Sequence, residues 1–212
     1  LDPSEIPKKG KESVGVGRQY CGRLGKKDNC QSGVFIGYSS KKGYGLLSCQ
    51  LYMQEFWFSE EYRERREKNL VPESITFLTK HQIAVKLLNR IDESGLFPAK
   101  WLGCDAAFGC DINFLESIPA NLLYFASIHS DELVFVQKPE VGLPVYKGRG
   151  RPPKKLQVLD GQKPVMVKEL AKSSEINWQP VILGEGAKGP ISAKVACLRV
   201  YRSREGLPVD RE

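Results

Sequence analysis

The segment 75–94 carries the clearest structural signal in the sequence, that of an amphipathic helix. Thr79 and Gln82 match a capping box, and Gly95 is a natural stop for the helix. The apolar residues of the segment recur at the spacing of one helical face: Ala84, Leu87, Leu88 and Ile91. Such a face needs an apolar layer to cover, so the helix is expected to pack on a sheet.

Short apolar runs on both sides of this helix predict the strands of that sheet. Residues 34–40 and 44–53 flank a Lys-Lys-Gly turn and predict a hairpin, while 101–104 and 122–128 predict two strands after the helix. Residues 1 and 2 are expected to end an earlier strand that Pro3 interrupts, and a loop is expected between residues 7 and 33. The pattern predicts an α/β fold, a mixed sheet flanked by helices.

The pattern changes at about residue 131. From there, short apolar runs alternate with breaks rich in glycine and proline, which predicts a β-rich part at 131–212 beside the α/β part at 1–130. The chain has no run near the ~18 apolar residues that span a bilayer, so no membrane segment is expected.

Two aspartates are the candidate catalytic groups. Asp105 directly follows the predicted strand 101–104, and Asp2 follows the first apolar residue of the chain. If the strands are neighbours, the two carboxylates meet at one edge of the sheet, where ligand sites of α/β folds form. Carboxylates are the usual protein ligands of Mg²⁺. The competing interpretations are a helix cap for Asp105 and a frayed terminus for Asp2.

Positive charge is concentrated in two segments of a chain whose net charge is +7. Lysine and arginine far outnumber acids between residues 8 and 42, and KGRGRPPKK at 147–155 contains no acid. This distribution predicts a polyanionic partner, most simply nucleic acid, although solubility alone also favours such charge.

The segment 147–155 also contains Arg-Gly-Arg-Pro, which resembles the core of an AT-hook. An extended Arg-Gly-Arg can lie in a narrow A·T minor groove, and the alternative is a basic loop that touches phosphates without reading sequence. Its candidate DNA-binding residues are Lys147, Arg149, Arg151, Lys154 and Lys155.

Three stretches together resemble the DDE-superfamily endonuclease domain of bacterial insertion-sequence transposases. They are DPSEIPKKG continued by SVGVGRQYCGRLGKKDNCQSGV, then KWLGCDAAFG, and finally WQPVILGEGAKGPISAKVACLRV. The resemblance implies an RNase H-like catalytic core at 1–130 and a β-rich insertion at 131–212. By position it makes Asp2 the first catalytic and metal-binding aspartate and Asp105 the second.

The implied activity is strand cleavage at transposon ends with Mg²⁺ (or Mn²⁺), followed by transfer of the 3′-hydroxyl into target DNA. Lys8, Lys9 and Arg18 follow the first strand, where they could hold DNA phosphates. The resemblance further implies DNA as the partner, a homo-oligomer in the DNA complex, and a bacterial cytoplasmic protein associated with the nucleoid.

The third carboxylate of the family, a glutamate on a helix after the insertion, has no counterpart that we can assign. No helical pattern follows Val200, so we expect this residue and its helix to lie outside the chain, in a longer protein. Two alternatives to a transposase therefore stay open: a catalytically incomplete remnant that still binds DNA, and a general metal-dependent nuclease.

Overall fold

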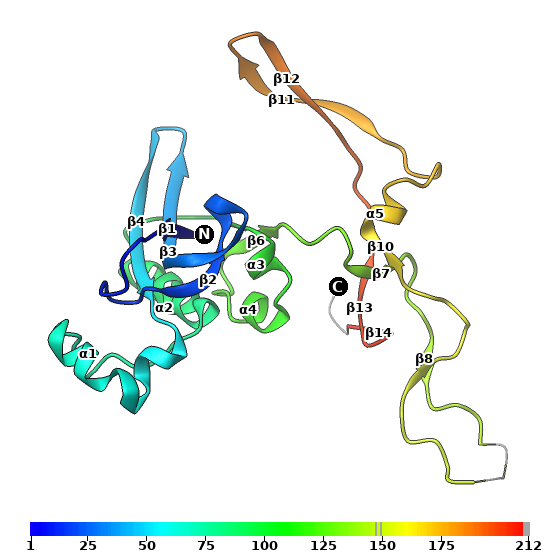
Figure 1. Cartoon of the computed structure of the whole chain (residues 1–212). Helices are drawn as coiled ribbons and strands as arrows, with labels where there is room; N and C mark the ends of the chain where they lie inside the picture. The colour runs from blue at the N-terminus through cyan, green and yellow to red at the C-terminus, as the bar shows by residue number, and fades with distance from the viewer. Residues whose placement is uncertain (147, 149, 210–212) are drawn as a thin grey trace. The chain divides into compact units, whose positions relative to one another are not determined.

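The computed structural model describes residues 1–146, 148 and 150–209. These fall into two compact units, Leu1–Ile128 and His129–Glu212, and each unit is described by itself. Figure 1 shows helices and sheet strands in the first unit and mostly strands and extended segments in the second. The predicted α/β class is confirmed at this level.

A four-stranded antiparallel sheet is built around the long strand β3 (Lys26–Ser40). Its partners are β1 (Asp2–Pro7), β2 (Gly17–Cys21) and β4 (Gly43–Tyr52). Cys30 pairs with β1 on one side and with β2 on the other. Strand β1 therefore lies on one side of β3, while β2 and β4 follow each other along the opposite side.

The N-terminal part of this sheet corrects two predictions. Strand β1 begins at Asp2 instead of ending there, and β2 with the first half of β3 occupies the predicted loop at 7–33. Strand β1 pairs with β3 alone along its length, and such a strand tolerates prolines. Polar side chains fix this region by bonding backbone, an order that hydrophobic periodicity does not reveal: Asn29 Nδ2 donates to the carbonyls of Lys8 and Gly10.

Helix α2 (Lys80–Ser94) confirms the strongest prediction, although it begins at residue 80 instead of 75. The Thr79 hydroxyl accepts a hydrogen bond from the Gln82 amide at 3.2 Å, and Gln82 Oε1 accepts one from the Thr79 amide at 2.9 Å. Gly95 ends the helix in the left-handed conformation, with φ at 65°. The cap therefore fixes where the helix starts, and with it the position of Lys80 and His81.

Four short elements follow α2: β5 (Trp101–Cys104), α3 (Ala106–Gly109), α4 (Ile112–Glu116) and β6 (Leu123–Ala126). Strands β5 and β6 pair in parallel. The amino group of Leu1 donates a hydrogen bond to the Gly103 carbonyl at 2.9 Å. This bond holds the start of β1 beside β5.

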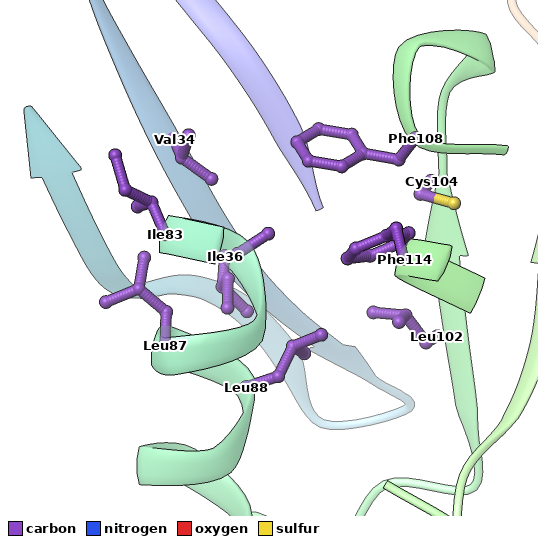
Figure 2. Packing of buried hydrophobic residues seen from close by; sticks show 10 residues of the cluster. Val34, Ile36, Ile83, Leu87, Leu88, Leu102, Cys104, Phe108 and Phe114 are labelled. Carbon is purple, nitrogen blue, oxygen red and sulfur yellow. The ribbon is translucent and has the colours of Figure 1, made fainter. Parts of the chain in front are cut away.

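The main core lies between α2 and the sheets. Figure 2 shows side chains of β3 and α2 facing those of β5, α3 and α4. The buried members are Val34, Ile36, Ile83, Ala84, Leu87, Leu88, Leu102, Cys104, Phe108 and Phe114. The helix thus buries the face that its sequence predicts.

A second, smaller core is built around Trp57, which is fully buried and packs with Val16 and Met53. The elements near it are short: η1 (Gly22–Leu24), η2 (Glu55–Phe58), η3 (Glu60–Tyr62) and α1 (Arg63–Lys68).

The second unit is rich in β-strands, as expected. One sheet has the order β10 (Val165–Met166), β7 (Leu133–Phe135), β13 (Tyr201–Arg204), β14 (Leu207–Pro208). Two further pairs are β8 (Val141–Gly142) with β9 (Gln157–Val158), and β11 (Gln179–Gly186) with β12 (Gly189–Val195). Among the described residues of this unit, the helix is the short α5 (Val167–Leu170). Between Val200 and Val209, the residues that the structure describes form no helix. Within the described part of the whole chain, no helix has the length and apolar character needed to cross a membrane.

We expect Gly109→Ala to lower the free energy of unfolding by about 1–3 kcal/mol, through overpacking. A Cβ at Gly109 would lie 2.1 Å from the Ser127 carbonyl oxygen and 2.8 Å from the Ala126 Cβ. Urea denaturation measures the loss. Gly45→Ala is the matched control, since a Cβ there meets nothing within 4 Å; equal stability of the two variants would contradict the prediction.

Candidate functional site

A cleft of about 700 Å³ opens in the first unit, where β1, the start of α2 and the β5–α3 junction converge. Asp2 and Asp105 both line it, although 103 positions separate them in the sequence. The other polar or charged side chains that line it are Ser4, Glu5, Tyr20, Arg23, Lys80 and His81.

Asp2 reaches the cleft as the first residue of β1. It pairs with Phe35 in the register with β3, and the neighbouring Leu1–Gly103 hydrogen bond ties this end of β1 to β5. The frayed-terminus interpretation does not fit a residue held on both sides in this way.

Asp105 directly follows β5 and stands at the N-cap position of α3, but its carboxylate accepts no capping hydrogen bond from that helix. Its Oδ1 atom is buried and has no hydrogen-bond partner among the described residues. Asp111 behaves in the opposite way, because its Oδ1 accepts a hydrogen bond from the Phe114 amide at 2.8 Å and caps α4. A buried polar atom without a partner is rare in folded proteins, so Asp105 is better explained by a ligand than by a cap.

The two aspartates interact electrostatically. Partial burial in the cleft raises the pKa of Asp2 above its ordinary value of 3.8, and the negative charge of Asp105 raises it further. Glu5 adds to this repulsion, and the positive amino terminus opposes it. A divalent cation bound between the carboxylates would relieve the repulsion.

Glu5 and Lys80 form an ion pair on the wall of the cleft. Lys80 Nζ lies 3.0 Å from Glu5 Oε1, which also accepts a hydrogen bond from the Ser32 hydroxyl. Glu5 Oε2 accepts one from the Gly22 amide. Burial acts to raise the pKa of Glu5, but the hydrogen bond and charge of Lys80 together with the hydrogen bonds from Gly22 and Ser32 outweigh it, and the pKa is lowered. The sequence analysis missed this pair, since 75 positions separate its members.

His81 was also not predicted from the sequence. It links the first turn of α2 to α3, the helix that follows Asp105. Its Nε2 lies 2.8 Å from the Ala107 carbonyl oxygen, which places the proton on that nitrogen. Its Nδ1 lies 3.9 Å from Asp111 Oδ2, and its ring packs edge to face on Phe108. Its only signal in the sequence is its position two residues after Thr79, the cap of α2.

The carboxylates suit Mg²⁺ or Mn²⁺ in chemistry, and both aspartates line the cleft. Both ions prefer oxygen ligands, and Asp105 Oδ1 is a buried oxygen with no protein partner. No cluster of three or more His, Cys, Asp or Glu suited to a metal occurs within the described ranges. The residues present could supply two carboxylate ligands, and substrate or solvent oxygens would have to complete the coordination.

The three basic residues predicted near the first strand lie outside the cleft lining. Lys8 and Lys9 follow β1, and Arg18 is exposed on β2. Of the basic residues in the described part of the chain, Arg23 and Lys80 are the ones that line the cleft.

The predicted DNA-binding segment 147–155 falls between β8 and β9 in the chain. Lys147 and Arg149 lie outside the described residues, while Arg151, Lys154 and Lys155 are exposed. Gly150 has a φ of 79°, and its carbonyl accepts a hydrogen bond from the Tyr146 hydroxyl. The backbone at Gly150 is therefore turned, in contrast to the extended form expected of an AT-hook.

We expect Asp2→Asn to raise the melting temperature in metal-free buffer at pH 7. The raised pKa means that ionised Asp2 opposes folding, so the cost is full above its folded pKa and disappears as the pH falls below its ordinary value of 3.8. The effect is modest because the side chain is partly exposed to water. Thermal melts between pH 7 and pH 3.5 measure it.

Asp28→Asn is the control of opposite sign for that experiment. The Asn29 amide and Lys26 lower the pKa of Asp28, so its ionised form favours folding. A melting temperature that falls in Asp2→Asn at pH 7 would contradict the account of the cleft.

The sequence was compared with protein-family models, with curated proteins and with solved structures. A family model described as "DDE superfamily endonuclease" matches residues 1–190. Neither the search of curated proteins nor that of solved structures found a match. The family match confirms the resemblance seen in the sequence.

Proposed function

Because the chain belongs to the DDE superfamily of endonucleases, whose substrate is DNA, we propose that it is the catalytic part of a transposase. Its specific activity would be metal-dependent strand cleavage at transposon ends and transfer of the freed 3′-hydroxyl into target DNA. The observation that carries the proposal is the convergence of Asp2 and Asp105 on one cleft, with Asp105 Oδ1 buried and unpartnered.

An RNase H-like arrangement of the first unit is part of the proposal. Strands β4, β3 and β1 follow one another in antiparallel pairs. The Leu1–Gly103 hydrogen bond sets β5 beside β1, and β6 pairs with β5 in parallel. Helix α2 connects β4 to β5 and packs on the core. In the structure β5 and β6 form a separate two-stranded sheet, and the proposal is that the two sheets together correspond to one mixed sheet with an active site at the Asp2 end of β1. The second unit is proposed as the β-rich insertion.

Asp2 and Asp105 are proposed to hold Mg²⁺ or Mn²⁺ and, through it, the DNA phosphate. When bound, the ion supplies Lewis-acid activation of the phosphodiester and of the attacking water or hydroxyl. The protein's own part is to hold the two aspartates together at the cleft. Glu5 is not proposed as a third ligand, since Lys80, Ser32 and Gly22 already donate to its two oxygens.

The basic segments are proposed as contacts to DNA phosphates. Lys8, Lys9 and Arg18 are offered by the first unit, and the exposed Arg151, Lys154 and Lys155 by the second. A homo-oligomer assembled on paired DNA ends is proposed with them.

Nicking of a supercoiled plasmid in Mg²⁺ or Mn²⁺ tests the activity, and linear DNA carrying the element's inverted repeats tests its specificity. The proposal predicts metal-dependent nicking and selective cleavage at the repeat ends. Metal-dependent nicking without preference for these ends would indicate a general nuclease. Binding without any nicking would indicate a remnant that only binds DNA.

A further inference from the structure

We infer that Lys80 contacts a phosphate oxygen of the DNA strand bound in the cleft, and that Glu5 positions Lys80 for this contact. The inference rests on the proposed function and assigns a substrate contact to a residue outside the aspartate pair. It starts from the observation that Lys80 lines the same cleft as Asp2 and Asp105.

The location of Lys80 is unfavourable for a residue that only stabilises the helix. It is the first residue of α2, and a cation at a helix N-terminus meets the positive end of the helix dipole. The capping box and the buried residues Ile83 and Ala84 fix that end of the helix. Lys80 is therefore held in place by its neighbours, at a position where local stability disfavours its charge.

The hydrogen-bonding capacities of the two partners are unequal. Glu5 is only 9% exposed in its side chain, and donors reach both of its oxygens. Lys80 is 27% exposed, and its ammonium has three donors. Within the described part of the chain it donates to Glu5 and lies 5.5 Å from the centre of the Tyr52 ring. The ammonium thus keeps donor capacity beyond its hydrogen bond to Glu5, which holds it in place.

The charge of the cleft creates the need for such a contact. Three carboxylates, Asp2, Glu5 and Asp105, line it with the cations Lys80 and Arg23. An anionic phosphate entering this cleft is repelled by the carboxylates. A metal ion at the aspartates would offset only the repulsion that comes from Asp2 and Asp105. A fixed ammonium offsets part of the remainder and orients the phosphate by a charge-assisted hydrogen bond.

The test is the salt dependence of DNA binding, measured with a short fluorescent duplex in Ca²⁺. The binding constant K falls as salt rises, and each lost phosphate contact makes the slope of log K against log salt shallower by about 0.9. We expect this loss in Lys80→Gln and recovery of the slope in Lys80→Arg. Lys86→Gln is the matched control, because Lys86 is exposed on the same helix and lies outside the cleft lining. An unchanged slope in Lys80→Gln would overturn the inference.

Glu5→Gln separates positioning from contact. It should keep the salt slope and lower kcat of plasmid nicking more than it raises KM, because the ammonium remains but is no longer held. The positioning role would be contradicted if the salt slope of Glu5→Gln were as shallow as that of Lys80→Gln. It would also be contradicted if kcat and KM of Glu5→Gln equalled those of the wild type.

A second measurement uses the wild-type protein and does not depend on whether Lys80→Gln folds. Lysine acetylation, quantified by mass spectrometry, should be slowed at Lys80 by the duplex and not at Lys86. Equal labelling of Lys80 with and without DNA would overturn the contact. If the wild type does not nick plasmid, the proposed function is overturned. The contact of Lys80 with DNA is still decided by the salt dependence of binding and by the acetylation of Lys80.

Discussion

Asp105→Asn is expected to lower the rate of metal-dependent plasmid nicking by at least about 100-fold. Asparagine keeps the shape of the side chain but removes its negative charge and one of its two ligand oxygens. Metal-assisted stabilisation of a phosphodiester transition state amounts to several kcal/mol, and each 1.36 kcal/mol is a factor of about ten in rate. The measurement is the initial rate of nicking of supercoiled plasmid in Mn²⁺.

The control for this variant is Asp28→Asn, an exposed aspartate of the same unit that lies outside the cleft lining. Its nicking rate should stay within about twofold of the wild type, as expected for a surface substitution. If Asp105→Asn nicks DNA at the wild-type rate, Asp105 is not part of the catalytic site. Because Asp105 Oδ1 has no protein partner to lose, loss of nicking in a variant that melts like the wild type cannot be attributed to unfolding.

Trp57→Ala is expected to cost about 3–5 kcal/mol of unfolding free energy, the range for deleting a buried aromatic side chain. Trp57 is fully buried, its Nε1 donates to the Val16 carbonyl at 2.9 Å, and the Arg65 guanidinium lies 5.1 Å from the centre of its ring. The substitution leaves a cavity and an unpaired carbonyl. Urea denaturation followed by circular dichroism measures the loss.

Trp101→Ala is the matched control, because Trp101 is 57% exposed. It removes the same number of atoms, but much of its surface already contacts water, so we expect a loss below about 1 kcal/mol. Equal losses in the two variants would contradict the assignment of Trp57 to a second core.

Helix α2 and strand β5 could be predicted from the sequence because their signals are local. The cap at Thr79 and the stop at Gly95 lie within one segment, and the strand 101–104 is a short apolar run that ends at Asp105. Their positions at strand ends made the two aspartates a pair only on the condition that the strands are neighbours, and the family resemblance then implied their catalytic roles. The structure brings both to one cleft.

The features that sequence analysis missed depend on contacts between distant residues. Strand β2 and the start of β3 have no apolar alternation, and side chains such as Asn29 order them through bonds to backbone. The Glu5–Lys80 pair joins a strand to a helix across 75 positions. His81 has an ordinary sequence context, and its role follows only from its distance to Ala107. Neither periodicity nor local spacing reports on such contacts.

The central claim is that Asp2 and Asp105 together bind a divalent cation. Its most direct test is a titration with Mn²⁺ followed by electron paramagnetic resonance of the free ion, in the wild type, Asp2→Asn, Asp105→Asn and Asp28→Asn. We predict that Mn²⁺ binding weakens by at least about tenfold in each cleft variant, since each lacks one of the two carboxylate ligands, and that it is unchanged in Asp28→Asn. Equal Mn²⁺ affinity in all four proteins would contradict it.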